Sequence, residues 1–257
     1  DIIVQLRPYS EKLSALLANV SSGSSDEGMQ TYAEEREVKS VLIVPVSSDR
    51  GLCGAFNSNI AKAVMRLTET EELQGKQIDI LPLGKKSFDN FKKKDFGLVS
   101  DYWEVFGDLT FDNVREAAEY AMNSFEEGKY DKVYLIYNEF KNVATQIIRT
   151  EQFLPIVELD KADDEVAANT DYIYEPSKDF IVEELIPKSL KIQFYKAVLE
   201  SNASEHGARM TAMGKATDNA GELLKELKLT YNRTRQAAIT KEILEIVGGA
   251  EALAADG

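Results

Sequence analysis

The fold is decided by residues 41–59, which read VLIVPVSSDRGLCGAFNSN. Residues 41–46 form a continuous apolar run of strand length, which is typical of a strand that is covered on both faces of a sheet. After the loop Ser47–Gly54, Asn57 is placed to cap a helix that runs to about Leu73. A buried strand, a tight loop and an amphipathic helix in this order indicate an α/β domain.

The same alternation of strand and helix patterns continues outward, from about Lys39 to Leu159. We expect the remaining elements in this order: a strand at 78–83, a helix at 87–94, a strand at 98–105, a helix at 111–127, a strand at 132–137, a hairpin strand at 143–153 and a short strand at 172–174. This order predicts a Rossmann-like, doubly wound and mostly parallel sheet with an antiparallel edge.

Long helices are expected at both ends of the chain. The stretch 188–253 contains no proline, and an unbroken helix over it is roughly 100 Å long at 1.5 Å per residue. A domain of this size has no core of that length, so most of the helix must pack against another partner. Near the N-terminus, a second apolar seam has spacings of three and four residues and is made by Leu6, Tyr9, Leu13, Leu16 and Val20. We therefore expect three parts: the remainder of an N-terminal helix at 1–22, a central α/β domain at 38–176 and a long C-terminal helix at 180–257.

The composition excludes several classes of function. The chain has 257 residues with 30 Lys and Arg against 44 Asp and Glu, so its net charge of −14 repels phosphate backbones and we expect no nucleic-acid partner. No apolar run reaches the roughly 18 to 20 residues that span a bilayer, so we expect no membrane span. The lone Cys53 cannot form an internal disulfide, and the lone His206 cannot supply a histidine cluster for a metal. We expect neither a metal nor a cofactor.

The loop after the first strand allows two interpretations. Two glycines beside Arg50 could cradle a phosphate, but the P-loop and G-x-G-x-x-G spacings are absent. In the interpretation that we favour, Gly51 and Gly54 permit a tight turn that Asp49 and Arg50 tether by hydrogen bonds. Cys53 is then expected to be a small buried residue and not a nucleophile.

Three segments resemble the gamma subunit of F-type ATP synthases. Residues 47–59, SSDRGLCGAFNSN, are similar to its S-D-R-G-L-C-G-x-[FY]-N loop, and residues 204–213, SEHGARMTAM, are similar to its S-E-H-x-A-R-M-x-A-M segment. Residues 232–243, NRTRQAAITKEI, resemble its C-terminal signature N-[RK]-x-R-Q-A-x-I-T-x-E-[IL]. Together with the order of the domains, the resemblance covers almost the entire chain.

The resemblance implies a rotor shaft without a catalytic site of its own. In this family the two terminal helices form an antiparallel coiled coil inside a ring of alternating alpha and beta subunits, and the α/β domain contacts the epsilon subunit and the c-ring. The shaft couples proton-driven rotation of the c-ring to ATP synthesis or hydrolysis at the catalytic sites of the beta subunits. The resemblance further implies a bacterial protein, peripheral on the cytoplasmic face of the inner membrane, whose N-terminal helix is truncated at Asp1.

The resemblance also implies roles for individual residues. Contact with the alpha and beta subunits is expected from Arg209, Arg233, Arg235, Gln236 and Thr240. An apolar tip, seated in the bearing of the ring, is expected from Ile243, Ile246, Val247 and Leu253. A structural role in the loop is expected for Asp49, Arg50, Gly51 and Gly54. The alternative role for each contact residue is to stabilise the coiled coil internally.

Two other functions stay open at this point. A Rossmann-type enzyme accounts for the sheet and the glycine loop, and it predicts nucleotide binding by the isolated chain. A coiled-coil scaffold accounts only for the long helix, and it predicts self-association. The rotor shaft accounts for both halves of the chain.

Overall fold

The computed structural model describes residues 3, 5–9, 13, 31–156 and 178–255. The chain divides into two units, Asp1–Thr211 and Ala212–Gly257. The first unit contains the sheet, and the second contains the C-terminal part of the long helix. The domain boundaries expected from the sequence, at residues 22, 38, 176 and 180, stay predictions.

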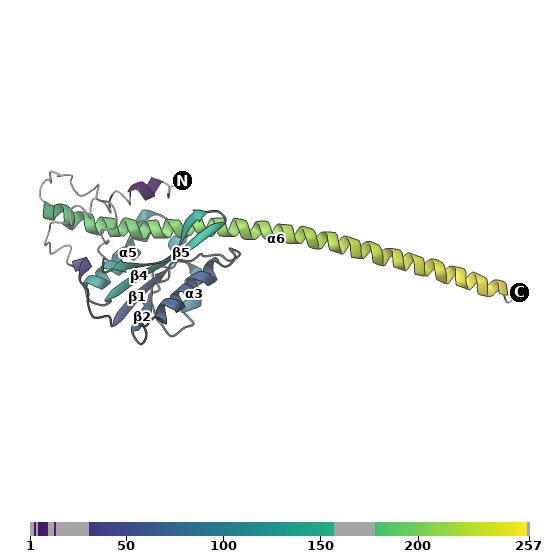
Figure 1. The fold of residues 1–257 in the computed structure, drawn as a ribbon, viewed down its shortest axis with the longest axis horizontal. Helices are drawn as coiled ribbons and strands as arrows, with labels where there is room; N and C mark the ends of the chain where they lie inside the picture. Colours follow the sequence, from purple (N-terminus) through teal and green to yellow (C-terminus); the bar gives the residue numbers. More distant parts are fainter. Residues whose placement is uncertain (1–2, 4, 10–12, 14–30, 157–177, 256–257) are drawn as a thin grey trace. The chain divides into compact units, whose positions relative to one another are not determined.

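A five-stranded sheet with the order β3-β2-β1-β4-β5 forms the centre of the first unit (Figure 1). β1 pairs in parallel with β2 and β4, β2 pairs in parallel with β3, and β5 pairs antiparallel with β4. The expected mostly parallel sheet with an antiparallel edge is confirmed. The strands are β1 (Ser40–Pro45), β2 (Gln77–Ile80), β3 (Gly97–Leu98), β4 (Lys132–Asn142) and β5 (Thr145–Leu154).

Helices connect the parallel strands and follow the sheet. They are α3 (Phe56–Thr68), α4 (Lys85–Phe91), α5 (Phe111–Glu126) and α6 (Lys178–Ala255), with a 3-10 turn η1 (Val105–Gly107) before α5. The start of α5 is capped by Thr110, whose hydroxyl accepts the Asn113 N–H at 3.4 Å. Gly128 follows its end with a φ of 72°, a conformation that suits glycine at the end of a helix. The long C-terminal helix expected from the sequence is confirmed as α6.

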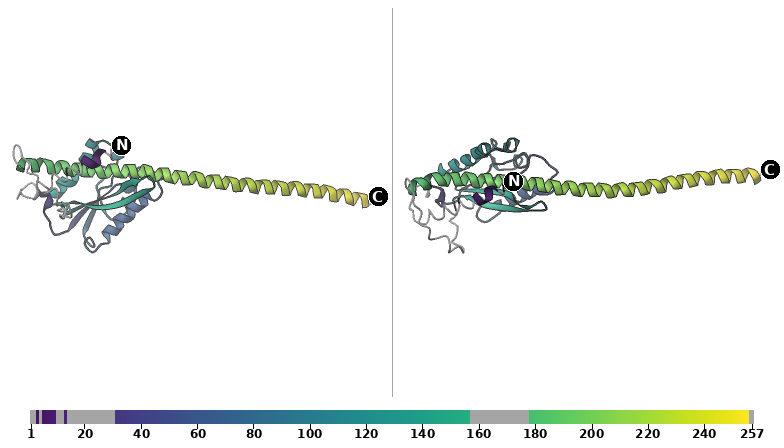
Figure 2. Two further views of the ribbon diagram at one scale, coloured as in Figure 1. Left: turned by 45° about the horizontal axis from the view of Figure 1, so that its top comes forward. Right: turned by 90° about the horizontal axis from the view of Figure 1, so that it is seen from above.

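Both faces of the sheet are covered, which explains the continuous apolar run in β1. Side chains alternate between the two faces of a strand. Leu42 and Val44 pack in one cluster with α5 and with residues of α6 such as Phe194. Val41 and Ile43 pack in a second cluster with α3 and α4. Figure 1 shows α5 and α6 on one side of the sheet and α3 on the other, and the views in Figure 2 show the first part of α6 running along the sheet.

The strand expected at 98–105 is wrong in length, because β3 is only two residues long. The Val99 N–H still donates to the Ile80 carbonyl at 2.9 Å. Pro82 then follows in the neighbouring segment and has no N–H to continue the pairing. The chain turns away after Val99 and forms η1 instead.

The start and end of α3 differ from expectation, and α6 contains a proline. α3 begins at Phe56 and ends at Thr68, and the side chain of Asn57 does not cap it. α6 begins at Lys178 and includes Pro187, although a proline inside a helix costs about 3 kcal/mol. Ile186 and Leu190, which flank this proline, are 3% and 4% exposed, so their packing on the sheet offsets the lost backbone hydrogen bond. The strand expected at 172–174 lies outside the described residues.

The helix in the second unit is exposed all round. Residues 213–252 of α6 are all exposed. Their large apolar side chains are Met213, Leu223, Leu224, Leu227, Leu229, Tyr231, Ile239, Ile243, Leu244, Ile246 and Val247. None of the described helices combines the length and the apolar character that a membrane crossing requires.

Candidate functional site

The loop that follows β1 is fixed at its first residues. Ser47 and Ser48 are 2% and 0% exposed. The Ser47 N–H donates to the Leu83 carbonyl at 2.8 Å, and the Ser47 hydroxyl accepts the Ser87 N–H at 2.8 Å. Gly84 approaches so closely that a Cβ there would lie 2.3 Å from the Ser47 carbonyl oxygen. The start of α4 therefore sets the direction in which the loop leaves β1.

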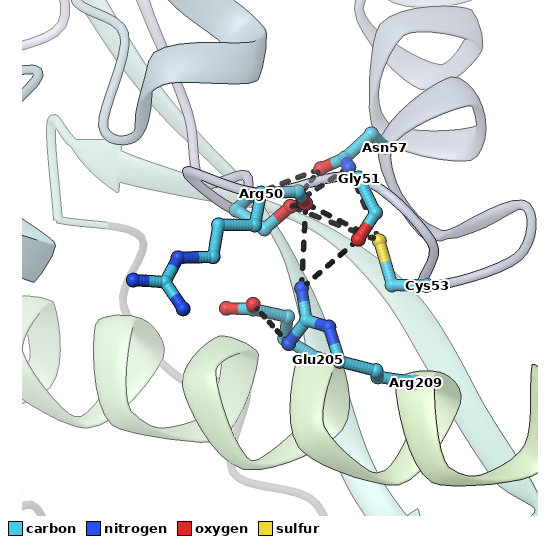
Figure 3. Close-up of polar contacts among 7 residues, drawn as sticks. Arg50, Gly51, Cys53, Asn57, Glu205 and Arg209 are labelled. Carbon is cyan, nitrogen blue, oxygen red and sulfur yellow. Dashed lines mark hydrogen bonds and ion pairs between the residues drawn. The ribbon is translucent and has the colours of Figure 1, made fainter. Parts of the chain in front are cut away.

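Asn57 holds the two ends of the loop together (Figure 3). Its Oδ1 accepts the Ser48 N–H at 3.0 Å, and its amide nitrogen donates to the Ser48 hydroxyl oxygen at 2.8 Å and to Cys53 Sγ at 3.2 Å. The Ser48 hydroxyl donates to the Arg50 carbonyl at 2.6 Å. Cys53 is 1% exposed, so the buried position expected for this cysteine is confirmed.

The remaining residues of the loop reach outward. Asp49 Oδ1 accepts the Lys85 N–H in the first turn of α4 at 2.9 Å. Arg50 is exposed, and its guanidinium extends away from the rest of the loop (Figure 3). Leu52 has a φ of 65°, which is rare for a residue with a side chain, and it is 76% exposed. Gly54 follows with a φ of 61°, which glycine adopts without strain.

Arg209 of α6 is hydrogen-bonded to this loop (Figure 3). Its Nη2 donates to the carbonyl oxygens of Arg50 and Gly51, both at 3.3 Å. Its Nη1 forms an ion pair with Glu205, one turn earlier on α6, at 2.6 Å. The Glu205 side chain is only 11% exposed, so its carboxylate depends on this guanidinium for charge compensation. Arginine suits the position because its planar group can donate to a carboxylate and to carbonyl oxygens at the same time.

Two further points attach α6 to the sheet. The Ser204 hydroxyl, which is buried, donates to the Asn138 carbonyl of β4 at 2.9 Å. Glu200 is 1% exposed and accepts Nε and Nη2 of Arg7 at 2.6 and 2.8 Å and the Phe140 N–H at 2.9 Å. Arg7 Nη2 also donates to the Phe140 carbonyl at 2.7 Å. The buried Glu200 carboxylate therefore joins three segments of the chain: α6, which carries it, the segment of Arg7, and β4, which contains Phe140.

The arrangement is suited to holding elements together. The partners of Cys53 Sγ are the Asn57 amide, the Arg50 carbonyl and the Ser48 hydroxyl, and none of these groups is the base that a cysteine nucleophile needs. His206 is exposed on α6. Among the described residues, no three His, Cys, Asp or Glu side chains are grouped so that they could hold a metal. The chemistry of this site is therefore that of a hydrogen-bonded junction between the loop and α6.

The other residues selected from the sequence lie on α6 in the second unit. Arg233, Arg235, Gln236 and Thr240 are all exposed. Ile243, Ile246 and Val247 are 54%, 72% and 48% exposed. Leu253 belongs to α6, but its side chain is not among those that the structure describes. The contacts and the tip assigned to these residues, and the partner contact assigned to Arg209, stay predictions.

Sequence reasoning missed Glu200, Glu205 and the loop-closing role of Asn57. A signal existed for Glu205, because a glutamate four residues before an arginine is a common ion pair on a helix. The contact between Arg209 and Arg50 joins residues 159 positions apart, and no spacing in a single sequence indicates it.

The chain is similar in sequence to known proteins. A family model described as ATP synthase matches residues 1–253. An ATP synthase gamma chain of Cytophaga hutchinsonii is 59% identical over 257 residues, which are 98% of this chain and 87% of that relative. One of Flavobacterium johnsoniae is 55% identical over 254 residues, with 98% and 87% of the two chains covered.

Solved structures share the fold at lower identity. A chain of the Euglena gracilis mitochondrial ATP synthase, in a structure of OSCP, F1 and the c-ring, matches with a TM-score of 0.59 and 20% identity over 98% of this chain and 92% of its own. A chain from the central stalk and c-ring of the Tetrahymena thermophila mitochondrial ATP synthase matches with a TM-score of 0.53 and 24% identity, over 84% of this chain and 100% of its own. The mostly parallel sheet with a long C-terminal helix, expected from the sequence, is therefore a fold that these two chains share.

Proposed function

The chain belongs to the ATP synthase family, in which its relatives are gamma chains, and we propose that it is the central rotor shaft of an F-type ATP synthase. It turns inside a ring of alpha and beta subunits. It couples proton-driven rotation of the c-ring to ATP synthesis or hydrolysis at the beta subunits. Its α/β domain contacts the epsilon subunit and the c-ring.

The observation that carries this proposal is the exposed helix of the second unit. Residues 213–252 of α6 are exposed, and Leu227 and Ile246 are 56% and 72% exposed. Burying one such side chain contributes roughly 1.5–3 kcal/mol, and helices in proteins gain most of their stability from packing. A helix that exposes this many large apolar side chains needs surrounding protein, and the ring of alpha and beta subunits supplies it.

The mechanism follows from the asymmetry of a single shaft in a ring of equivalent sites. The shaft presents a different face to each beta subunit, so the contacts that favour the open or the closed state differ from site to site. These contacts shift the populations of the two states. When the shaft turns by a third of a revolution, the sites exchange states.

Torque must pass between the α/β domain and the helix without slippage. The contacts of Glu200, Ser204 and Arg209 supply this connection, because each ties α6 to the sheet or to its loop. α6 is one helix from Lys178 to Ala255, so a rotation of its anchored part is transmitted through the helix itself. Polar and directional contacts suit a junction that must keep its orientation under load.

The residues that touch the ring are proposed on the family's pattern. Contact with alpha and beta is assigned to Arg233, Arg235, Gln236 and Thr240, whose exposed polar groups can form and release directional bonds as the shaft turns. The family's pattern assigns such a contact to Arg209 as well, but its guanidinium is bonded to Glu205 and to the Arg50 and Gly51 carbonyls, so we assign it to the junction with the sheet. The bearing tip is assigned to Ile243, Ile246, Val247 and Leu253. The chain acts without a catalytic site or cofactor of its own, on the cytoplasmic face of a bacterial inner membrane as a peripheral part of the complex.

Reconstitution tests this function. The purified chain is mixed with alpha and beta subunits from the same organism, and the product is weighed by native mass spectrometry while its ATPase activity is measured. We expect one copy of the chain for three alpha and three beta subunits, with ATPase activity well above that of the subunits alone. A chain that stays free, or that forms only its own oligomers, contradicts the rotor role.

A further inference from the structure

A groove lies between α3 and the edge strand β5, whose positions are labelled in Figure 1. Its volume is about 360 Å³. Leu67 of α3 and Ile148 and Thr150 of β5 belong to its lining. Ile148 and Thr150 are two positions apart, so they face the same side of the strand. Ile148 is 39% exposed, because α3 leaves this part of the sheet face open.

The charge of the groove is opposite to that of the chain. Its lining contains Lys62 and Arg66 and no carboxylate, although the net charge of the chain is −14. Within the described part of the chain, neither cation forms an ion pair or a hydrogen bond. They are four positions apart on α3, where like charges repel and destabilise a helix. The pair therefore has no stabilising partner inside the described fold, and a carboxylate from outside would supply one.

The strand beside the groove offers backbone groups as well. β5 is ten residues long and lies at the edge of the sheet, paired only with β4 among the described strands. Edge strands of this length present unpaired N–H and C=O groups to which a second extended chain can add.

We propose that this groove binds an extended acidic segment of another subunit of the complex, an inference that rests on the proposed function. The segment adds to β5 by backbone hydrogen bonds. Its alternate side chains, about 7 Å apart on one face of a strand, place two carboxylates near Lys62 and Arg66, which are about 6 Å apart along the helix axis. A further side chain on the same face of the segment is apolar and packs against Leu67 and Ile148.

Site-directed photocrosslinking in the assembled complex tests this. The photoreactive amino acid p-benzoylphenylalanine replaces Thr150 in the groove, or the exposed Thr145 on the same strand as the matched control. After irradiation, mass spectrometry identifies the joined peptide. We expect the Thr150 position to join a subunit segment with acidic residues at alternate positions, and the Thr145 position not to join it.

Charge variants of the same labelled chain decide whether the cations bind the segment. Lys62→Glu with Arg66→Glu should lower the crosslink yield at least tenfold, whereas Lys62→Arg with Arg66→Lys should keep it. Lys62 and Arg66 are both exposed, so neither double substitution disturbs the core. The proposal is overturned by the absence of a crosslink, by a crosslink to a segment without acidic residues, or by a yield that charge reversal leaves unchanged.

The same samples separate this inference from the proposed function. Native mass spectrometry and ATPase activity are recorded before irradiation. An assembled and active complex without the expected crosslink contradicts the groove alone. A chain that does not assemble with alpha and beta contradicts the rotor role, and the groove proposal falls with it.

Discussion

Gly84 has a φ of 96°, and a Cβ at this position would lie 2.3 Å from the Ser47 carbonyl oxygen. A side chain there is opposed both by the backbone conformation and by a backbone atom that cannot move aside. We expect Gly84→Ala to lower the free energy of unfolding by roughly 2–4 kcal/mol, measured by urea denaturation. Gly51→Ala is the control, because nothing lies within 4 Å of the added Cβ, and it should change stability by less than about 0.5 kcal/mol. Equal effects of the two variants would contradict the close approach.

Tyr137 links stability to alkaline pH. Its hydroxyl donates to Glu151 Oε1 at 2.8 Å, and burial, followed by the charge and hydrogen bond of Glu151, raises the pKa of Tyr137 above the ordinary value of 10.0. The folded state therefore favours the neutral phenol. Its contribution to stability is complete below the unfolded pKa near 10 and is lost as the pH rises further, by at most about 1.4 kcal/mol per pH unit.

The corresponding variant is Tyr137→Phe, which keeps the buried ring and removes the titrating group. Between about pH 9 and pH 11, its free energy of unfolding should fall by roughly 1 kcal/mol less than that of the unchanged chain. Urea denaturation at both pH values measures the difference. Tyr231→Phe, at a position that is 68% exposed, should leave the pH dependence as it was. If Tyr137→Phe left the pH dependence of the free energy of unfolding unchanged, this explanation would be wrong.

Among the elements, α6 and the β4–β5 hairpin meet at a glycine. A Cβ on Gly207 would lie 3.2 Å from the Val143 carbonyl oxygen and 3.4 Å from the Phe140 ring. A larger side chain must push the helix away from the hairpin, so we expect Gly207→Leu to destabilise the first unit by roughly 2–3 kcal/mol. The lone tryptophan, Trp103, is in this unit, and its fluorescence during chemical denaturation reports the change.

Gly214→Leu is the matched control on the same helix. Nothing lies within 4 Å of a Cβ at Gly214, and leucine has the higher helix propensity, by somewhat less than 1 kcal/mol. The Trp103 transition should therefore shift by less than about 0.5 kcal/mol. If both glycine variants moved it alike, helix propensity and not the contact with the hairpin would be responsible.

Elements whose signals are local were predictable from the sequence. β1 could be recognised because both of its faces are buried, and α5 because its apolar residues lie on one face and Gly128 closes it. β3 could not be bounded, because its length depends on Pro82 in a strand segment that only the fold brings beside it. Pro187 lies inside the helix that is expected at 180–257, and the packing of its neighbours outweighs the local cost of a proline there.

The candidate site was predictable only in part, for a related reason. The glycines and Asp49 mark a tight turn by their residue types alone. Asn57 also carries an ordinary capping signal, but its side chain is used to close the loop on Ser48 and Cys53. The bond from Arg209 to Gly51 spans 158 positions, so it follows from the packing of α6 on the sheet and from no local pattern.

On the scale of the whole molecule, the two units are stabilised in different ways. The first has buried clusters on both faces of its sheet, whereas residues 213–252 are exposed. Backbone hydrogen bonds in an exposed helix open locally far more often than those of a core strand. We expect amides of 213–252 to exchange with deuterium at least a hundredfold faster than those of 41–44 in the chain alone.

Assembly should change only one of these rates. When purified alpha and beta subunits are added, exchange in 213–252 should slow markedly because the ring covers the helix, and exchange in 41–44 should stay as slow as before. Hydrogen exchange read by mass spectrometry follows both segments in one sample. Fast exchange in 213–252 that persists in a complex of the right mass would argue against burial of this helix in the ring.

Coupling between rotation and catalysis depends on contacts that form and break in turn. Arg235 and Gln236 are exposed on α6, and their removal takes away a planar cation and an amide without creating a cavity in either unit. We expect Arg235→Ala with Gln236→Ala to lower the coupled ATPase activity several-fold while native mass spectrometry shows the same assembly. The reason is that directional contacts with the ring contribute to the transitions of the beta subunits and little to the folding of the chain. Lys86→Ala with Gln74→Ala also removes one cation and one side-chain amide, from exposed positions of the α/β domain, and it should leave the ATPase activity unchanged. If the two double variants turned over ATP equally well, the contacts assigned to this part of α6 would not be the ones that couple the shaft to the ring.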